Sequence, residues 1–409
     1  MKKYIYLVCL LLLINFPFVT ISAQNTDAVR FFDDEQNRRQ RDRFIGLRMN
    51  SGTILPTDEF TSTFDTPYYQ SLSLRFGFRS TGNNWQDFAF GMPYLGFGLY
   101  VADFPTKREV FGNPIALYMF HGGKILNFTR RWSWHYEWHL GMAFNWNYFD
   151  PIDNPQNIVI GSSTTAYASI NTYTRFRITP RLDVNAGIGF SHFSNGAHRL
   201  PNRGMNLITP FVELAYSLDN RERTIVQATP IAPPVRFEPR IDYDFKFTLS
   251  SRQIAVDTIN IGSRYFNHNF PVLGFSFTPL VVPNFRYKYG LSLDVVYDQS
   301  SNARAWREWY NGQLHDRVRL APFGERFAVG LSVRGEITMP TYTFFANIGY
   351  NFIRHTNEPR TYQIIGIKIY PREELFATFG VRATQFSRAQ YLYWSLGYTF
   401  QGRPIRRRR

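Results

Sequence analysis

Apolar and polar residues alternate along most of the chain, and the longest alternating run extends from Trp132 to Tyr148. Every second residue of this run is apolar, and polar or small residues occupy the positions between them. A period of two places successive side chains on opposite faces of a β-strand. The run would extend about 55 Å at roughly 3.3 Å per residue, which is longer than an ordinary globular strand. A tilted membrane strand explains this length, and the aromatic residues at both ends match the girdles of an outer-membrane barrel.

Shorter alternating runs recur from residue 43 to residue 400, and no segment shows a convincing helical period. We expect about 16 strands, and a count of about 12 or 14 stays open. The expected strands are approximately 43–53, 68–80, 91–103, 113–122, 131–149, 162–178, 181–194, 206–218, 240–251, 268–279, 285–299, 324–337, 340–352, 360–370, 375–387 and 389–400. The predicted fold class is therefore all-β: a transmembrane antiparallel outer-membrane β-barrel of about 12–16 strands in one barrel.

A long, proline-rich stretch separates a first half, 43–218, from a second half, 240–400. We favour a periplasmic excursion of a single barrel here, and the alternative is a linker between two barrels of about eight strands each. Outer-membrane barrels have short inner turns and longer outer loops. With the N-terminus inside, the short turns near 179–181, 282–284 and 338–341 fall inside, and the long stretch around 300–323 falls outside.

The first 23 residues are typical of a secretory signal peptide, because two lysines precede an apolar run that ends in small residues. A polar segment, 24–42, follows the signal, and a basic tail, 401–409, follows the barrel. Cys9, the only cysteine, lies inside the signal, which excludes disulfides and cysteine nucleophiles from the exported protein. The remaining chain lacks an apolar run near the ~20 residues of a spanning helix. We therefore expect strands that cross the outer membrane of a Gram-negative bacterium.

The chain is strongly basic, with a formal net charge of +15 and four final arginines, Arg406 to Arg409. For an exported chain, this charge favours anionic lipid head groups or phosphorylated saccharide over nucleic acid as the partner. Arg199 and Arg203 lie in an expected outer loop, where they could bind lipid phosphates bidentately. Ordinary solvated loop charge explains them about as well.

A histidine and a serine continue the apolar row of the expected strand 181–194. His192 and Ser194 share the lipid-facing parity of that strand, and Asn206 shares the lipid-facing parity of the next one. Polar groups that face hydrocarbon are costly enough to suggest a function. A serine hydroxyl becomes nucleophilic when a histidine accepts its proton, and a third group that fixes the ring improves the base.

We therefore predict His192 as the base, Ser194 as the nucleophile and Asn206 as the group that orients the imidazole. Two residues of spacing place the Cα atoms of His192 and Ser194 about 6.5 Å apart on one face, within reach of a hydrogen bond. The backbone N–H groups of Asn195 and Gly196 are suited to hold an oxyanion. The alternative is that the polar side chains simply lie at the membrane interface, and parity alone favours this alternative slightly.

The segment from His192 to Gly196 resembles the His-x-Ser-Asn-small motif of the lipid A 3-O-deacylase (PagL) family of outer membranes. The flanking PNRGMN at 201–206 resembles the turn of that family, and segments of the first half look like its longer relatives, the acyloxyacyl hydrolases. The second half adds only a barrel-like pattern. The resemblance implies a histidine base at His192 and a serine nucleophile at Ser194 on the outer surface of the barrel, with lipid A as substrate.

One position departs from the deacylase pattern. The deacylases have a glutamate twelve residues after the serine, whereas this chain has Asn206. The triad also resembles that of outer-membrane phospholipase A, which has an asparagine at this spacing. Glu213, the nearest acid downstream, has the opposite parity to His192. Residues near the phospholipase motif help to bind calcium, but Ala197 follows the motif here, so calcium dependence stays open and no other cofactor is expected.

A second cluster of polar residues lies on the inward face of the long alternating run. His135, Glu137 and His139 are metal-ligand types. The interior of a barrel is polar in any case, so a lumen network explains the cluster better and we expect no metal site.

The sequence thus predicts a serine esterase that deacylates lipid A at the lipid-facing surface of the barrel. An outer-membrane phospholipase A-type hydrolase is the alternative within the same class. A non-catalytic pore or scaffold barrel is the alternative from another class. The expected partners are the outer membrane and its lipopolysaccharide or phospholipid; no nucleic acid is expected, and a homodimer stays open.

Overall fold

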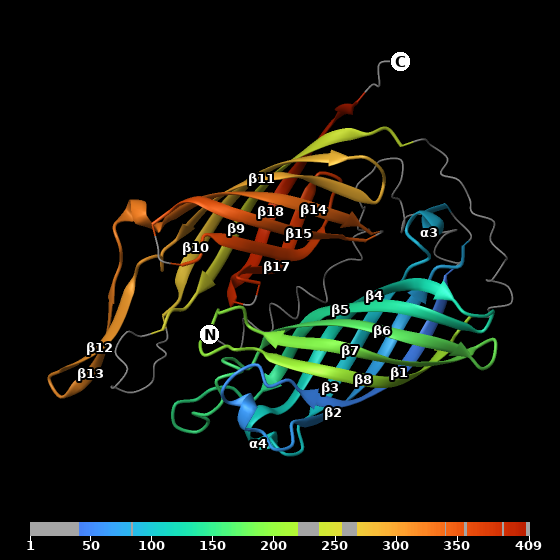
Figure 1. Cartoon of the computed structure of the whole chain (residues 1–409), viewed down its shortest axis with the longest axis horizontal. Helices are drawn as coiled ribbons and strands as arrows, with labels where there is room; N and C mark the ends of the chain where they lie inside the picture. The colour runs from blue at the N-terminus through green and yellow to red at the C-terminus, as the bar shows by residue number, and fades with distance from the viewer. Residues whose placement is uncertain are drawn as a thin grey trace.

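The computed structural model describes residues 41–82, 85–219, 237–255, 268–339, 341–355, 358–386 and 388–405. The expected signal peptide, the segment 24–40 and Arg406–Arg409 lie outside the described residues. Figure 1 shows two barrels side by side, one coloured from blue to green and the other from yellow to red.

The first barrel consists of eight antiparallel strands in sequence order, and it closes where the last strand pairs with the first. Its strands are β1 (Asp42–Ile54), β2 (Tyr68–Arg79), β3 (Tyr94–Asp103), β4 (Gly112–Asn127), β5 (Trp132–Trp146), β6 (Thr165–Arg177), β7 (Leu182–Ser194) and β8 (Met205–Ser217). Two short helices, α3 (Trp85–Ala89) and α4 (Arg108–Phe111), lie in its connections, as does a 3₁₀ turn at Thr61–Thr63.

The second barrel also closes with eight antiparallel strands. Its strands are β9 (Arg240–Arg252), β10 (Phe270–Val282), β11 (Tyr287–Asp298), β14 (Phe327–Thr338), β15 (Thr343–Arg354), β16 (Thr361–Ile369), β17 (Leu375–Thr384) and β18 (Arg388–Pro404). Between β11 and β14, the strands β12 (Arg304–Tyr310) and β13 (Gln313–Arg319) form a separate hairpin, followed by a 3₁₀ turn at Phe323–Arg326. None of the described helices has the length and apolar character needed to cross a bilayer.

The all-β, outer-membrane-barrel fold class is confirmed, but the favoured arrangement as a single barrel is wrong. The alternative with two barrels of eight strands is the observed one. The physical reason is that β8 pairs with β1 and β18 pairs with β9, so each half satisfies its own sheet edges and leaves no strand to pair with the other half. Alternation alone cannot show which strands pair at the ends of a sheet.

Both barrels have apolar outer surfaces and polar interiors. On the outside, Leu74 and Phe97 are about 60% exposed, whereas Arg75 inside the barrel is 1% exposed. This is the reverse of a water-soluble protein and the expected arrangement for a barrel that is surrounded by lipid.

A charged network fills the lumen of the first barrel. Glu137 accepts hydrogen bonds from Arg48 (2.8 Å) and Arg75 (2.6 Å), and it contacts His139 Nε2 at 2.8 Å. Glu213 binds the same two arginines from the other side. The inward cluster of His135, Glu137 and His139 is thus part of a polar lumen network, because the carboxylate oxygens of Glu137 are taken by arginine and histidine.

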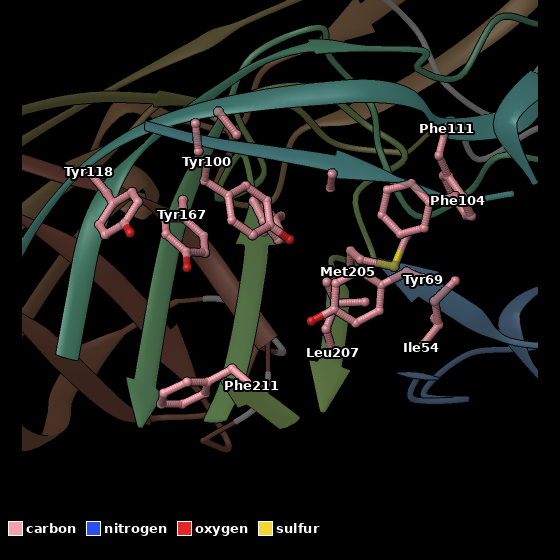
Figure 2. Close-up of a cluster of buried hydrophobic side chains, with 14 of the residues drawn as sticks. Ile54, Tyr69, Tyr100, Phe104, Phe111, Tyr118, Tyr167, Met205, Leu207 and Phe211 are labelled. Atoms are coloured by element: carbon pink, nitrogen blue, oxygen red, sulfur yellow. The ribbon is translucent and has the colours of Figure 1, made fainter. Parts of the chain in front are cut away.

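Aromatic and apolar side chains fill the first barrel near the end that carries the β7–β8 loop. Figure 2 shows part of this cluster, in which Tyr100 and Tyr167 lie near the middle of the barrel and Phe104, Phe111 and Met205 lie toward its end. Their burial, at 0–3% exposure, gives the strands at this end a rigid inner support.

The two barrels have the same orientation in the membrane, because equivalent ends of the two barrels contact each other. At one end the ring of Trp85, in the β2–β3 connection, lies 5.1 Å from that of Phe285, in the β10–β11 turn. At the other end Gln253, just after β9, binds the β7–β8 loop. Tyr342, in the short connection between β14 and β15, packs edge-on against Trp138 of β5 at 5.0 Å.

The expected sidedness of the turns agrees with this orientation. The short connections after β6, β10 and β14 lie at the end that carries α3, and the long 299–326 connection with the β12–β13 hairpin lies at the opposite end (Figure 1). By the loop-length rule, the end with the hairpin and the β7–β8 loop is the outer one.

Candidate active site

The candidate triad is built where β7 and β8 reach the outer end of the first barrel. His192 of β7 lies directly opposite Asn206 of β8 in the strand register. Their inward-facing neighbours, Phe193 and Met205, are fully buried, and the Phe193 ring stacks on Tyr167 at 4.8 Å. Because side chains alternate along a strand, these two anchors hold His192 and Asn206 on the outer face.

His192 and Asn206 form the hydrogen bond that the sequence predicts. The distance from His192 Nδ1 to Asn206 Oδ1 is 2.7 Å. The amide nitrogen of Asn206 donates to Thr57 Oγ1 at 3.0 Å, which sets the orientation of the amide. Since Asn206 Oδ1 is an acceptor, His192 Nδ1 carries the proton and Nε2 is the nitrogen that can act as a base.

Ser194 has a different set of partners from the predicted one. Its Oγ accepts hydrogen bonds from the side-chain amide of Asn202 (2.8 Å) and from the backbone N–H of Gly196 (3.1 Å). Within the described residues, the hydroxyl forms no hydrogen bond with His192. Ser194 Oγ is the acceptor in both observed bonds, so its hydroxyl hydrogen is free. His192 and Ser194 occupy positions i and i+2 on β7. A rotation about the Cα–Cβ bond of Ser194 is therefore the movement that would direct this hydrogen toward His192.

The two predicted oxyanion donors differ in availability. The N–H of Gly196 points at Ser194 Oγ, next to the place where an oxyanion would form. The N–H of Asn195 is already bound to Asn202 Oδ1 at 3.1 Å. The side-chain amide of Asn195 donates to Ser162 Oγ (3.1 Å) and to the carbonyl of Arg199 (2.9 Å). It therefore connects the β7–β8 loop to the segment between β5 and β6.

Asn202 is a site residue that the sequence reasoning missed. Its amide nitrogen donates to Ser194 Oγ and its amide oxygen accepts from the N–H of Asn195. Asn202 lies in the loop between β7 and β8, where alternation carries no information about side-chain direction. The available signal was the PNRGMN segment itself, which places two asparagines close to the serine.

Gly204 packs against the imidazole. Its φ is +80°, and a Cβ atom at this position would lie 2.7 Å from His192 Cε1. A glycine is needed here both for the left-handed backbone and for the close approach of the ring.

The two predicted phosphate-binding arginines lie in the same loop and are exposed. The guanidinium of Arg199 lies 5.0 Å from the centre of the Tyr148 ring. The backbone N–H of Arg203 donates to the carbonyl of Ile158, which fixes the loop beside the site. Both cations therefore lie at the outer end of the barrel, near Ser194.

A family model for the C-terminal domain of acyloxyacyl hydrolases (PagL_C) matches residues 241–402. This half of the chain is similar to the PagL family. The match covers the second barrel, from β9 to β18, whereas the His192–Gly196 segment lies in the first barrel. The second half, in which the sequence showed only a barrel pattern, thus carries the family similarity.

Solved structures match the chain only at low sequence identity. The crystal structure of the outer-membrane enzyme PagL is 13% identical, with a TM-score of 0.27, and the alignment covers 41% of this chain and 97% of that one. A mutant of the TodX monoaromatic hydrocarbon channel is 8% identical (TM-score 0.18; 89% and 90% covered). An outer-membrane channel from Pseudomonas putida F1 is 9% identical (TM-score 0.18; 88% and 95% covered). No curated protein matches the chain.

Proposed function

We propose that this protein is an outer-membrane serine esterase that removes an acyl chain from lipid A, with Ser194 as the nucleophile. The observation that carries the proposal is the 2.7 Å bond between His192 Nδ1 and Asn206 Oδ1 on the outer face of the barrel, two residues from a serine. This bond leaves Nε2 as a base on the side of the molecule that faces lipid.

The proposed reaction uses four groups of this chain. His192 Nε2 accepts the proton of Ser194 as Oγ attacks the ester carbonyl, and Oγ–carbonyl bond formation places a negative charge on the carbonyl oxygen. The N–H of Gly196 and the side-chain amide of Asn202 donate to Ser194 Oγ. When Oγ bonds to the carbonyl carbon, these two donors are close to the carbonyl oxygen that becomes charged, and we expect them to stabilise it. The protonated His192 then gives its proton to the leaving alcohol, and a water activated by His192 releases the fatty acid.

Lipid A is the proposed substrate because the site combines a serine that continues the outward-facing row of β7 with cations at the outer end of the barrel. Ser194 itself is 9% exposed. Arg199 and Arg203 flank the site and suit the phosphates of a glycolipid of a Gram-negative outer leaflet. The similarity of the second barrel to acyloxyacyl hydrolases supports the same substrate class.

A phospholipase A-type activity is the second candidate, and Asn206 is the observation that favours it. An asparagine binds the catalytic imidazole here, where the deacylase resemblance implies a glutamate. Calcium dependence is an expectation of the phospholipase candidate alone, and the same assay tests it.

The lumen of the first barrel is filled by side chains, which argues against a role as a pore. Arginine and glutamate side chains cross the lumen, and the cavity lined by Arg48, Tyr100 and His139 has a volume of about 10 Å³. Such a cavity holds roughly one water molecule.

The experiment that separates these candidates incubates the purified protein in detergent with lipid A or with phospholipid, each with and without calcium. Released fatty acid is measured by mass spectrometry. We expect release from lipid A that does not need calcium. Release from phospholipid alone would replace the deacylase proposal with the phospholipase one, and the absence of release from either lipid would contradict an esterase.

Gly204→Ala is expected to lower the rate of fatty acid release by about ten-fold to a hundred-fold, because the added methyl group displaces the His192 ring and misplaced catalytic groups cost rates of this order. The matched control is Gly312→Ala in the β12–β13 turn. Gly312 has a similar φ of +72° but open space around it, so it reports the backbone strain alone. Equal activity of Gly204→Ala and Gly312→Ala would show that the ring does not depend on Gly204.

A further inference from the structure

The loop that follows Ser194 is bound to the second barrel through Gln253. The backbone N–H of Gln253 donates to the carbonyl of Ala197 at 3.0 Å, and its side-chain oxygen accepts from the N–H of Leu200 at 2.9 Å. Gln253 lies just after β9 and is 4% exposed. These two bonds hold both ends of the segment 197–200 from a different barrel.

Two consecutive residues of this loop have a left-handed backbone conformation. Gly196 and Ala197 have φ values of +59° and +64°, and Ala197 is not a glycine. A left-handed conformation is unfavourable for alanine, so it persists where surrounding contacts fix it. The bond from Gln253 to the Ala197 carbonyl is such a contact.

A third contact lies closer to the serine. A Cβ atom added to Gly196 would lie 2.7 Å from Cγ and Cδ2 of Leu392, which belongs to β18 of the second barrel. Leu392 therefore covers the Cα of Gly196, the residue whose N–H donates to Ser194 Oγ. The carbonyl of Leu392 is in turn fixed by Ser250 Oγ of β9 at 2.5 Å.

We propose that the second barrel is a positioning element for the active site of the first, with Gln253 and Leu392 as the positioning residues. They hold the segment 196–200 so that the N–H of Gly196 and the side chain of Asn202 reach Ser194. The inference rests on the proposed esterase function, and it gives the second barrel a role in turnover although the triad lies entirely in the first.

The test uses the full chain and a volume-matched substitution. Gln253→Met removes the acceptor for the Leu200 N–H, whereas Gln253→Glu keeps an acceptor oxygen. Gln390→Met is the control, because Gln390 is also buried in the second barrel but binds Arg382 and Glu358 there. Leu392→Ala is a second variant that removes only a partly exposed side chain.

Two readouts are needed, and one of them is independent of activity. Hydrogen–deuterium exchange of the Leu200 amide reports whether its hydrogen bond to Gln253 is present. The values of kcat and KM for lipid A report the effect of that bond on turnover. Gln253→Met is expected to speed exchange at Leu200 and to lower kcat by about five-fold to ten-fold, the size of effect that one neutral hydrogen bond has, with KM within about two-fold. Gln253→Glu is expected to restore kcat, Leu392→Ala to lower it, and Gln390→Met to leave it unchanged.

The inference would be overturned if Gln253→Met and Leu392→Ala both fold and keep the wild-type kcat. It would also be overturned if Gln390→Met lowered kcat as much as Gln253→Met does. If the wild-type protein hydrolyses no lipid, the proposed function fails, and the labelling rate of Ser194 by an alkyl fluorophosphonate then replaces kcat. A labelling rate that these variants leave unchanged would overturn the positioning role on its own.

Discussion

Ser194→Ala is expected to lower fatty acid release from lipid A by about 10³-fold or more, because the proposed acyl-enzyme bond is formed by the Oγ that this substitution removes. The oxygen of Ser194 is the atom toward which Gly196 and Asn202 direct their donors. The protein should remain folded, since the Ser194 side chain lies at the end of β7 and outside the lumen network. Fatty acid release is measured by mass spectrometry at equal amounts of folded protein.

Ser191→Ala is the matched control for this prediction. Ser191 belongs to the same strand but faces the lumen, where its Oγ donates to Ser169 Oγ at 3.1 Å. Its loss should leave the rate within a few-fold of wild type. Undiminished release by Ser194→Ala would remove the proposed nucleophile.

Glu137→Gln is expected to destabilise the first barrel by about 3–5 kcal/mol, the usual cost of breaking a buried ion pair by removing one partner. Glu137 is 1% exposed and binds both Arg48 and Arg75. Without its charge, two buried guanidinium groups share the single carboxylate of Glu213. Denaturant unfolding of the protein in lipid vesicles, followed by tryptophan fluorescence, measures the change in the free energy of unfolding.

Glu308→Gln is the control for the lumen prediction. Glu308 pairs with Arg317 on the exposed β12–β13 hairpin at 2.6 Å, with both side chains more than 40% exposed. Water screens this pair, so its loss should change stability little. An equally small effect for Glu137→Gln would show that the lumen network does not stabilise the barrel.

Most of the fold follows from alternation, because a membrane strand must present apolar residues to lipid and polar residues to the lumen. All sixteen barrel strands lie where the sequence predicts them, with bounds that differ by a few residues. The division into two barrels could not be derived in this way, because closure depends on which edge strands pair. The β12–β13 hairpin was missed because it lies outside the lipid, so its residues are not held to an apolar outer face.

Strand parity predicts the part of the candidate site that lies on β7 and β8. His192 and Asn206 are opposite each other in the register, and their hydrogen bond follows from that position. The partners of Ser194 were not predictable, because Asn202 lies in a loop. The contact of Gln253 with this loop could not be predicted for another reason, since it joins two barrels and strand alternation does not show which outer faces pack together.

The role of Ser194 as nucleophile is measured most directly by its reaction with a long-chain alkyl fluorophosphonate, detected by mass spectrometry of the peptide that contains residues 182–199. We expect a covalent adduct on Ser194 in the wild-type protein and a strongly reduced adduct in His192→Ala, because the imidazole activates the hydroxyl. An unmodified Ser194 in a folded protein that still releases fatty acid from lipid A would contradict this role.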